Sequence, residues 1–291
     1  MRVVSCEYQG QSRWGVAVGE QLYLAPITRA WARDVRQWIE DSTDPLGLAK
    51  TLPDEGEGPI DVADVQLAAP LPNPRQNVMC LGLNYAAHAE ESMRVKGKAL
   101  EMPEHPVVFT KSTRCVAGPY DAVPLDTAIT AELDWEVEIA LIVGTHLHKA
   151  DTATAQAGIL GYTVVNDLSA RDIQFRHKQF FLGKSLTNAC PMGPTLVTAD
   201  EVIDPQRLEL YCHVNGTLKQ AGNTADQVFR AIEIVRLLSW VMPLAPGDII
   251  ATGTPDGVGF ARNPPEFLRP GDRVACEVVG IGRIDNPIVA A

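Results

Sequence analysis

Apolar and polar side chains alternate along many segments of this chain, most clearly between Leu133 and Gly144. The odd positions of that segment are apolar, and acidic residues stand between them: Asp134, Glu136 and Glu138. A period of two residues predicts a β-strand. Residues two apart in a strand share a face, so Glu136 and Glu138 are expected side by side with like charge.

The first part of the chain predicts a small α+β module. Three short apolar runs, "RVVSCEY", "RWGVAV" and "QLYLAP", read as strands, and Trp31, Val35 and Ile39 follow at helical spacing. Residues 43–75 are rich in proline and predict a linker or irregular arm that ends near Pro74. We therefore expect a small N-terminal α+β domain at 1–72 and a larger domain at 73–291.

The larger part predicts many strands and two helices. The strand segments are "NVMCLGLN", "HPVVFTK", "DWEVEIALIVG", "ILGYTVVND", "GPTLVT", "LELYCHVNG", "DIIATGT" and "RVACEVVGIG". One helix is expected from Ser169 to Phe180, and another over residues 225–241, opened by Thr224 and Gln227 at capping-box spacing. Strands outnumber helices without regular alternation. This favours an α+β, mainly β fold, a sandwich or barrel, over a doubly wound sheet.

Composition excludes several classes of function. The 291 residues are 46% hydrophobic, enough to fill a core, and the formal net charge of −11 argues against non-specific nucleic-acid binding. No apolar run is as long as a membrane span, and the N-terminus lacks the pattern of a signal peptide, so we expect a cytoplasmic protein with no membrane partner. The six cysteines form no CxxC pair, which favours neither a zinc site nor a disulfide framework.

A third carboxylate, Asp167, ends the apolar strand "YTVVND" just before a predicted helix. If Asp167 lies near Glu136 and Glu138, the three would repel one another unless a cation sits among them. Ligand sets made only of oxygen favour Mg²⁺ or Mn²⁺. A half-buried strand with a solvated acidic face is the alternative that the pattern leaves open.

His88 and Glu91 in "LGLNYAAHAEE" are three residues apart, which puts both on one face of a helix. The carboxylate can then orient the imidazole while the other ring nitrogen takes a proton from water. An exposed histidine with an incidental acidic neighbour remains the alternative.

Several other polar residues are candidates for binding an anionic substrate. Lys111 and Lys184 follow apolar or glycine-containing stretches, although surface lysines are the simpler explanation. Arg171 and Gln174 lie one helical turn apart after Asp167. The glycine-rich turn in "PGDIIATGTPDGVGF" matches no nucleotide-binding motif, but it can offer backbone N–H groups and the Thr254 hydroxyl to a carboxylate.

Six motifs in order make the chain resemble the fumarylacetoacetate hydrolase superfamily from about Cys80 to Val289. They are "GLNYAAHAEE", "PVVFTK", "LDWEVEIALIVG", "GYTVVNDLSARDIQ", "GKSLTNACPMGP" and "PGDIIATGTPDGVG". The resemblance implies a mixed β-sandwich roll, usually a homodimer, behind a less constrained N-terminal domain. Many relatives read "GKSFD" where this chain has "GKSLT", so Thr187 replaces an acid.

The resemblance also implies roles for the candidate residues. Mg²⁺ or Mn²⁺ is expected on Glu136, Glu138 and Asp167. His88 and Glu91 match a dyad on a lid, and Lys184 matches an active-site lysine. Arg171, Gln174 and Thr254 fall where substrate contacts are made.

The first hypothesis for function is metal-dependent hydrolysis of a C–C bond in an acylpyruvate or related 2,4-dioxo acid. In it, His88 activates water, and the metal and Lys184 stabilise the enolate. The alternatives on the same site are an oxaloacetate-type decarboxylase, a 2-hydroxydienoate isomerase or tautomerase, and a catalytically silent ligand-binding member. All of these take a small anionic oxo acid.

Overall fold

The computed structural model describes residues 1–95, 97, 99 and 102–291, and a long mixed sheet runs through it. The order of strands along this sheet is β4-β3-β2-β1-β14-β12-β11-β17-β6-β7, with β5 beside β1 and β8 beside β14. The bounds are β1 Arg2–Tyr8, β2 Gln11–Val18, β3 Gln21–Leu24, β4 Glu57–Asp61, β5 Gln66–Leu67, β6 Val78–Gly82, β7 Val107–Lys111, β8 Val116–Ala117, β11 Val137–Val143, β12 Ile159–Asn166, β14 Cys190–Thr198 and β17 Ile249–Ala251.

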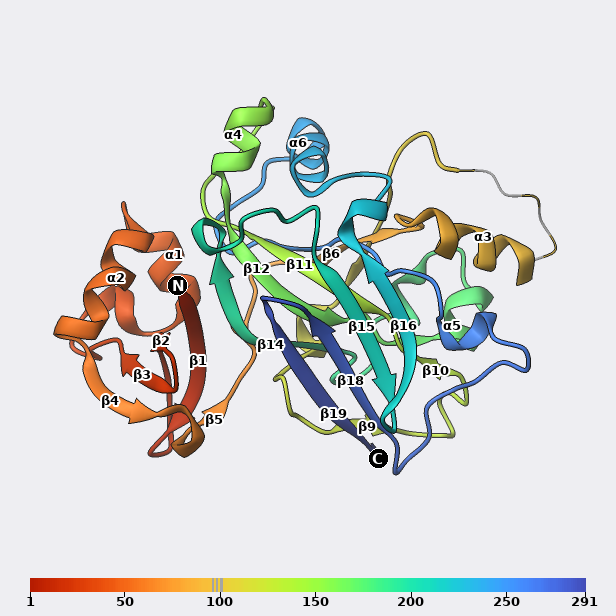
Figure 1. Ribbon diagram of the computed structural model, residues 1–291, viewed down its shortest axis with the longest axis horizontal. Helices are drawn as coiled ribbons and strands as arrows, with labels where there is room; N and C mark the ends of the chain where they lie inside the picture. Colours follow the sequence, from red (N-terminus) through yellow and green to blue (C-terminus); the bar gives the residue numbers. More distant parts are fainter. Residues whose placement is uncertain (96, 98, 100–101) are drawn as a thin grey trace.

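A second sheet packs on the central strands of the first and completes a sandwich. Its order is β16-β15-β18-β19-β9, and β15, β18 and β19 contact β11, β12 and β14 (Figure 1). The bounds are β9 Val123–Leu125, β15 Glu209–Val214, β16 Thr217–Asn223, β18 Arg273–Val278 and β19 Gly282–Ala290. Every residue of β11 and β12 is buried. The expected mainly β, α+β fold is confirmed.

The N-terminal strands continue the large sheet at the end drawn in red and orange in Figure 1. Two helices cover them, α1 Val35–Asp41 and α2 Pro45–Glu55, and β1 joins β14 by the register Arg2↔Val197 and Val3↔Leu196. The prediction of an irregular arm at 43–75 was wrong for α2. Asp44 caps that helix by accepting the Gly47 N–H, and Pro45 stands in its first turn, where proline is tolerated.

The remaining helices are α3 Ala86–Val95, α4 Thr152–Ala157, α5 Arg171–Arg176 and α6 Ala231–Val241. The helix expected from Ser169 begins later, because Ser169–Ala170 forms strand β13, which pairs with β10 Leu133–Asp134. The helix expected from residue 225 also begins later. Gln227 donates its side-chain amide to the Thr252 hydroxyl at 2.8 Å instead of capping a helix. In the described part of the chain, the structure contains no helix with the length and apolar character needed to cross a membrane.

Candidate metal centre and pocket

Three carboxylates meet where β11 begins and β12 ends. Glu136 directly precedes β11, Glu138 lies on it, and Asp167 directly follows β12. The register pairs Val137 with Asn166, and the Asp167 N–H donates to the Glu136 carbonyl at 2.9 Å. Carboxylate oxygens of Glu136, Glu138 and Asp167 therefore lie within 4.8 Å of one another, and all three residues are buried. This is the cluster that the sequence predicts, and a solvated acidic face is excluded.

Cations contact two members of the cluster. Lys184 Nζ donates to Glu136 at 2.6 Å and to Asp167 at 2.7 Å. Arg171 Nη2 donates to the other oxygen of Glu136 at 2.6 Å. Glu138 has no such partner among the described residues and accepts only the Gly253 N–H, at 2.8 Å.

The charges of this buried network do not cancel. It contains four carboxylates and three cations, so the carboxylates outnumber the cations by one; the members are Asp134, Glu136, Glu138, Asp167, Lys111, Arg171 and Lys184. Burial raises the pKa of Glu138 well above its ordinary value, and the charges of Asp167 and Glu136 raise it further. Burial also opposes ionisation of Glu136, but the charges of Lys184 and Arg171 outweigh it and hold the pKa of Glu136 below its usual range.

The cluster fits a divalent metal ion by its donor chemistry. All three residues offer carboxylate oxygen, the ligand that Mg²⁺ and Mn²⁺ prefer. A divalent ion would also compensate the excess negative charge and the unpaired Glu138. The structure thus brings the three expected metal ligands together in one place. Which of the two metals they bind stays a prediction.

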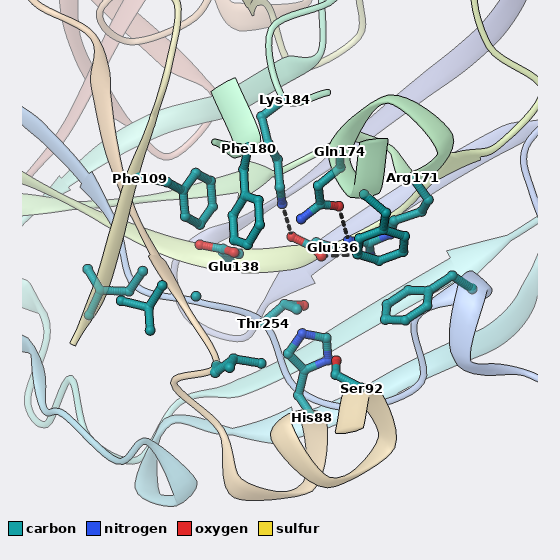
Figure 2. A pocket seen from close by; sticks show the side chains of 16 residues that line it. His88, Ser92, Phe109, Glu136, Glu138, Arg171, Gln174, Phe180, Lys184 and Thr254 are labelled. Atoms are coloured by element: carbon teal, nitrogen blue, oxygen red, sulfur yellow. Dashed lines mark hydrogen bonds and ion pairs between the residues drawn. The ribbon is translucent and has the colours of Figure 1, made fainter. Parts of the chain in front are cut away.

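A pocket opens above the cluster, and helix α3 lies across it from the carboxylates (Figure 2). His88 Nδ1 lies 2.9 Å from Glu91 Oε1, and Glu91 Oε2 accepts the Gly257 N–H at 3.0 Å. Since Nδ1 faces Glu91, Nε2 is the ring nitrogen left to meet a molecule in the pocket. The side chains that line the pocket include His88, Glu136, Glu138, Arg171, Gln174, Lys184 and Thr254 among the polar residues, and Leu81, Leu83, Val107, Phe109, Phe175, Phe180 and Phe260 among the apolar ones.

Not every predicted residue reaches the pocket. Lys111 is fully buried and does not line it; its Nζ donates to Asp167 Oδ1 at 2.7 Å and to the Leu168 carbonyl at 3.0 Å. Lys111 is thus placed to orient Asp167, not to contact a substrate. Thr254 lines the pocket, but its hydroxyl already donates to the Val137 carbonyl at 2.8 Å and accepts from Gln220. Thr187, which replaces an acid, lies at a separate hollow beside Ala291.

Sequence reasoning missed several residues of the site, and two of them, Asp134 and Phe260, contact Arg171. Asp134 is fully buried and accepts a hydrogen bond from Arg171 Nε at 2.8 Å, and the Phe260 ring lies 4.4 Å from the Arg171 guanidinium. Burial raises the pKa of Asp134, while Arg171 and the Phe260 N–H act against that rise. The available signal was that Asp134 is the first acid of the same alternating run as Glu136 and Glu138.

Known proteins are similar to this chain in fold and in sequence. Residues 77–289 match the family described as Fumarylacetoacetate (FAA) hydrolase C-terminal. An oxaloacetate tautomerase of Bacillus subtilis, YisK, is 42% identical over 259 residues, which span 89% of this chain and 82% of the relative. The structure of the fumarylacetoacetate hydrolase of the psychrophile Exiguobacterium antarcticum superposes with a TM-score of 0.82 at 33% identity, with 100% of both chains covered. A maleylpyruvate hydrolase of Sphingobium sp. SYK-6, solved with manganese(II) and pyruvate, gives a TM-score of 0.79 at 27% identity, again with 100% of both chains covered.

Proposed function

The chain belongs to the fumarylacetoacetate hydrolase family, and from that premise we propose that it is a metal-dependent tautomerase that interconverts the enol and keto forms of oxaloacetate. The observation that carries the proposal is the arrangement of the pocket, with a buried carboxylate cluster on one wall and a proton-transfer group, His88, on the helix across from it. The likeness to an oxaloacetate tautomerase supports this choice of reaction.

Glu136, Glu138 and Asp167 would hold the metal ion, which we propose to be Mg²⁺ or Mn²⁺. When bound, the ion supplies Lewis acidity that lowers the free energy of enolate character on a 2-oxo acid. Lys184 adds a fixed positive charge beside Glu136 and Asp167, where a dianionic substrate needs one.

His88 is placed to transfer the proton. In the conversion of enol to keto, the hydroxyl on C2 loses a proton and C3 gains one, so the reaction needs a group that can both accept and donate. The Glu91 carboxylate at Nδ1 orients the ring so that Nε2 faces the pocket, where it can accept a proton or donate one. No water is consumed, and the apolar walls around the site limit its access.

Hydrolysis of an acylpyruvate, the first hypothesis from the sequence, is the second candidate. The observation that favours it is the same His88–Glu91 pair, which can deprotonate water as well as a substrate. The structural likeness to a maleylpyruvate hydrolase also supports it. The relative with 42% identity supports tautomerisation instead, so hydrolysis ranks second.

The experiment compares both reactions with one protein preparation. Protein freed of metal with a chelator is supplied with Mn²⁺ or Mg²⁺. The loss of enol-oxaloacetate is then followed by ultraviolet absorbance, and pyruvate release from an acylpyruvate is followed separately. We expect metal-dependent enol loss that is faster than cleavage. Faster cleavage would support the hydrolase, and metal binding without either activity would support a ligand-binding member.

The matched control uses two histidines. His88→Ala removes the imidazole in the pocket, and His148→Ala removes an exposed one. We expect enol loss to fall by about two orders of magnitude or more in the first variant, because general acid–base groups contribute on that scale, and to stay unchanged in the second. Full activity of His88→Ala would remove the proposed proton-transfer step.

A further inference from the structure

Asp134, which sequence reasoning missed, forms an ion pair with the arginine that also contacts the carboxylate cluster. We propose that Asp134 is a positioning residue that divides the positive charge of Arg171, and so sets the balance between metal affinity and affinity for an anionic substrate. This inference rests on the proposed function for the identity of the substrate, but not for the metal site.

Asp134 is buried and its carboxylate accepts only N–H donors. Besides the bond from Arg171 Nε at 2.8 Å, Oδ1 accepts the Trp135 N–H at 2.8 Å and the Gly259 N–H at 2.6 Å. The Phe260 N–H donates to Oδ2 at 3.0 Å. A side chain that faces only donors acts as an acceptor at both oxygens, which is the behaviour of the ionised form.

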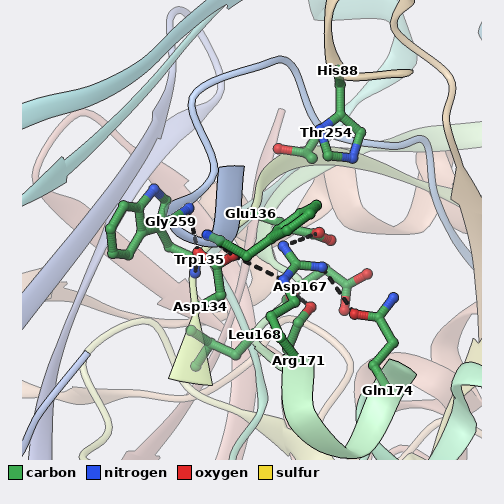
Figure 3. A network of polar contacts seen from close by, with 12 residues as sticks. His88, Asp134, Trp135, Glu136, Asp167, Leu168, Arg171, Gln174, Thr254 and Gly259 are labelled. Atoms are coloured by element: carbon green, nitrogen blue, oxygen red, sulfur yellow. Dashed lines mark hydrogen bonds and ion pairs between the residues drawn. The ribbon is translucent and has the colours of Figure 1, made fainter. Parts of the chain in front are cut away.

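Arg171 connects Asp134 to the metal cluster (Figure 3). Its Nε donates to Asp134, its Nη2 to Glu136 and its Nη1 to the side-chain oxygen of Gln174 at 2.9 Å. The guanidinium charge is therefore shared between Asp134 and a predicted metal ligand. If Asp134 were neutral, Glu136 would be the only carboxylate left on Arg171 and would be a weaker ligand for a cation.

The same carboxylate fixes one wall of the pocket. Its bonds to the backbone of Gly259 and Phe260 place the Phe260 ring over the Arg171 guanidinium, 4.4 Å from its centre. A Cβ at Gly259 would come within 2.7 Å of Asp134 Oδ1, so the approach depends on glycine at this position. Asp134 thus contacts Arg171, which pairs with the predicted metal ligand Glu136, and Phe260, which lines the pocket. Asp134 itself does not line the pocket.

The charge of Asp134 should affect the affinities for the metal ion and for an anionic substrate in opposite directions. Asp134→Asn keeps the shape and one acceptor oxygen but removes one carboxylate from a network in which carboxylates outnumber cations by one. A cation should then bind less tightly and an anion more tightly. A residue with a merely structural role would weaken both kinds of binding together.

The test measures both affinities without turnover. Calorimetric titration of chelated protein gives the Kd of Mn²⁺, and titration of Mn²⁺-saturated protein gives the Kd of oxalate, a stable dianion. For Asp134→Asn we expect a Kd for Mn²⁺ that is higher by on the order of tenfold and a lower Kd for oxalate. Parallel weakening of both ligands, or no change in either, would overturn the proposal.

Two further variants serve as a substitute and as a control. If Asp134→Asn fails to fold, Asp134→Ser replaces it, because serine is also neutral and keeps an acceptor. We expect the same higher Kd for Mn²⁺ and lower Kd for oxalate in this variant. Asp248→Asn makes the matched change at another buried acid, which accepts the Ala245 N–H outside the site, and both affinities should stay at the wild-type values. Neither titration needs catalysis. The result can therefore be interpreted even if the protein proves not to be a tautomerase.

Discussion

At the scale of single residues, Glu138 is the cluster member whose charge the protein itself does not compensate. Its carboxylate accepts one backbone N–H, and burial raises its pKa. In Glu138→Gln the amide oxygen can keep the bond to Gly253, while the uncompensated charge disappears. We expect chelated Glu138→Gln to unfold at the wild-type temperature or above it. We also expect Mn²⁺ to raise the unfolding temperature of the wild-type protein but not that of the variant.

Differential scanning calorimetry with and without Mn²⁺ checks this expectation. Glu136→Gln is the informative comparison, because Glu136 pairs with both Lys184 and Arg171. Its loss removes one of the two carboxylate partners from each of these buried cations, which keep only Asp167 and Asp134, so the chelated variant should unfold below the wild-type temperature. A stabilising effect of Mn²⁺ that survives in Glu138→Gln would exclude Glu138 as a ligand.

Some residues of the site could be predicted from the sequence and others could not, for physical reasons. Glu136, Glu138 and Asp167 lie at strand ends that alternation reveals, so their meeting follows from pairing β11 with β12. Asp134 and Lys111 act through partners distant in sequence, at separations of 37 and 56 residues. Local pattern contains no information on such partners, so Lys111 was predicted as a substrate contact and Asp134 was not singled out.

At the scale of elements, α3 is the support of the proposed proton-transfer group. Besides the bond from Gly257 to Glu91, Arg94 Nη2 donates to the Ala261 carbonyl at 3.1 Å near the end of the helix. Removal of a bond worth about 1 kcal/mol should loosen the docking of α3 and lower kcat for enol loss about fivefold in Arg94→Ala. The unfolding temperature should fall by no more than about 2–4 °C, because the change removes only this one bond of an exposed side chain.

Stopped-flow kinetics of Arg94→Ala beside Arg207→Ala tests this role of α3. Arg207 is also exposed, with 81% of its side chain accessible, but it pairs with Asp204 outside the pocket. Equal kinetics in the two variants would show that docking of the helix end does not limit turnover. Hydrogen exchange should increase within α3 only in Arg94→Ala.

The elements themselves were predicted unevenly. Long aliphatic strands such as β11 and β12 stand out by pattern, whereas α2 begins at Pro45 and contains Pro53, residues that read as breaks. The segment "LDWEVEIALIVG" reads as one strand, but it contains two complete strands, β10 and β11, with Trp135 and Glu136 between them. The interruption arises because β10 pairs with β13 while β11 pairs with β12, which is a tertiary choice.

At the scale of the whole molecule, one apolar core runs from the N-terminal strands into the sandwich. It includes Trp14 and Trp38 under the N-terminal helices as well as Leu196, Val164 and Leu141 of the central strands. Backbone pairing of β1 with β14 makes the two parts one sheet. We therefore expect residues 1–72 to unfold together with the rest of the chain, even though they contribute no residue to the site pocket.

Trp38→Ala tests this coupling. Trp38 is fully buried, lies 4.9 Å from Trp14 between ring centres and donates to the Pro45 carbonyl. A large-to-small change of this kind costs about 3–5 kcal/mol. If the core is cooperative, calorimetry should show a single transition at a lower temperature. Mn²⁺ should still raise that temperature, since the proposed metal ligands are untouched. Trp240→Ala, at an exposed tryptophan, should unfold like the wild-type protein. Two separate transitions in Trp38→Ala, of which Mn²⁺ shifts only one, would instead show that the N-terminal part unfolds independently of the sandwich.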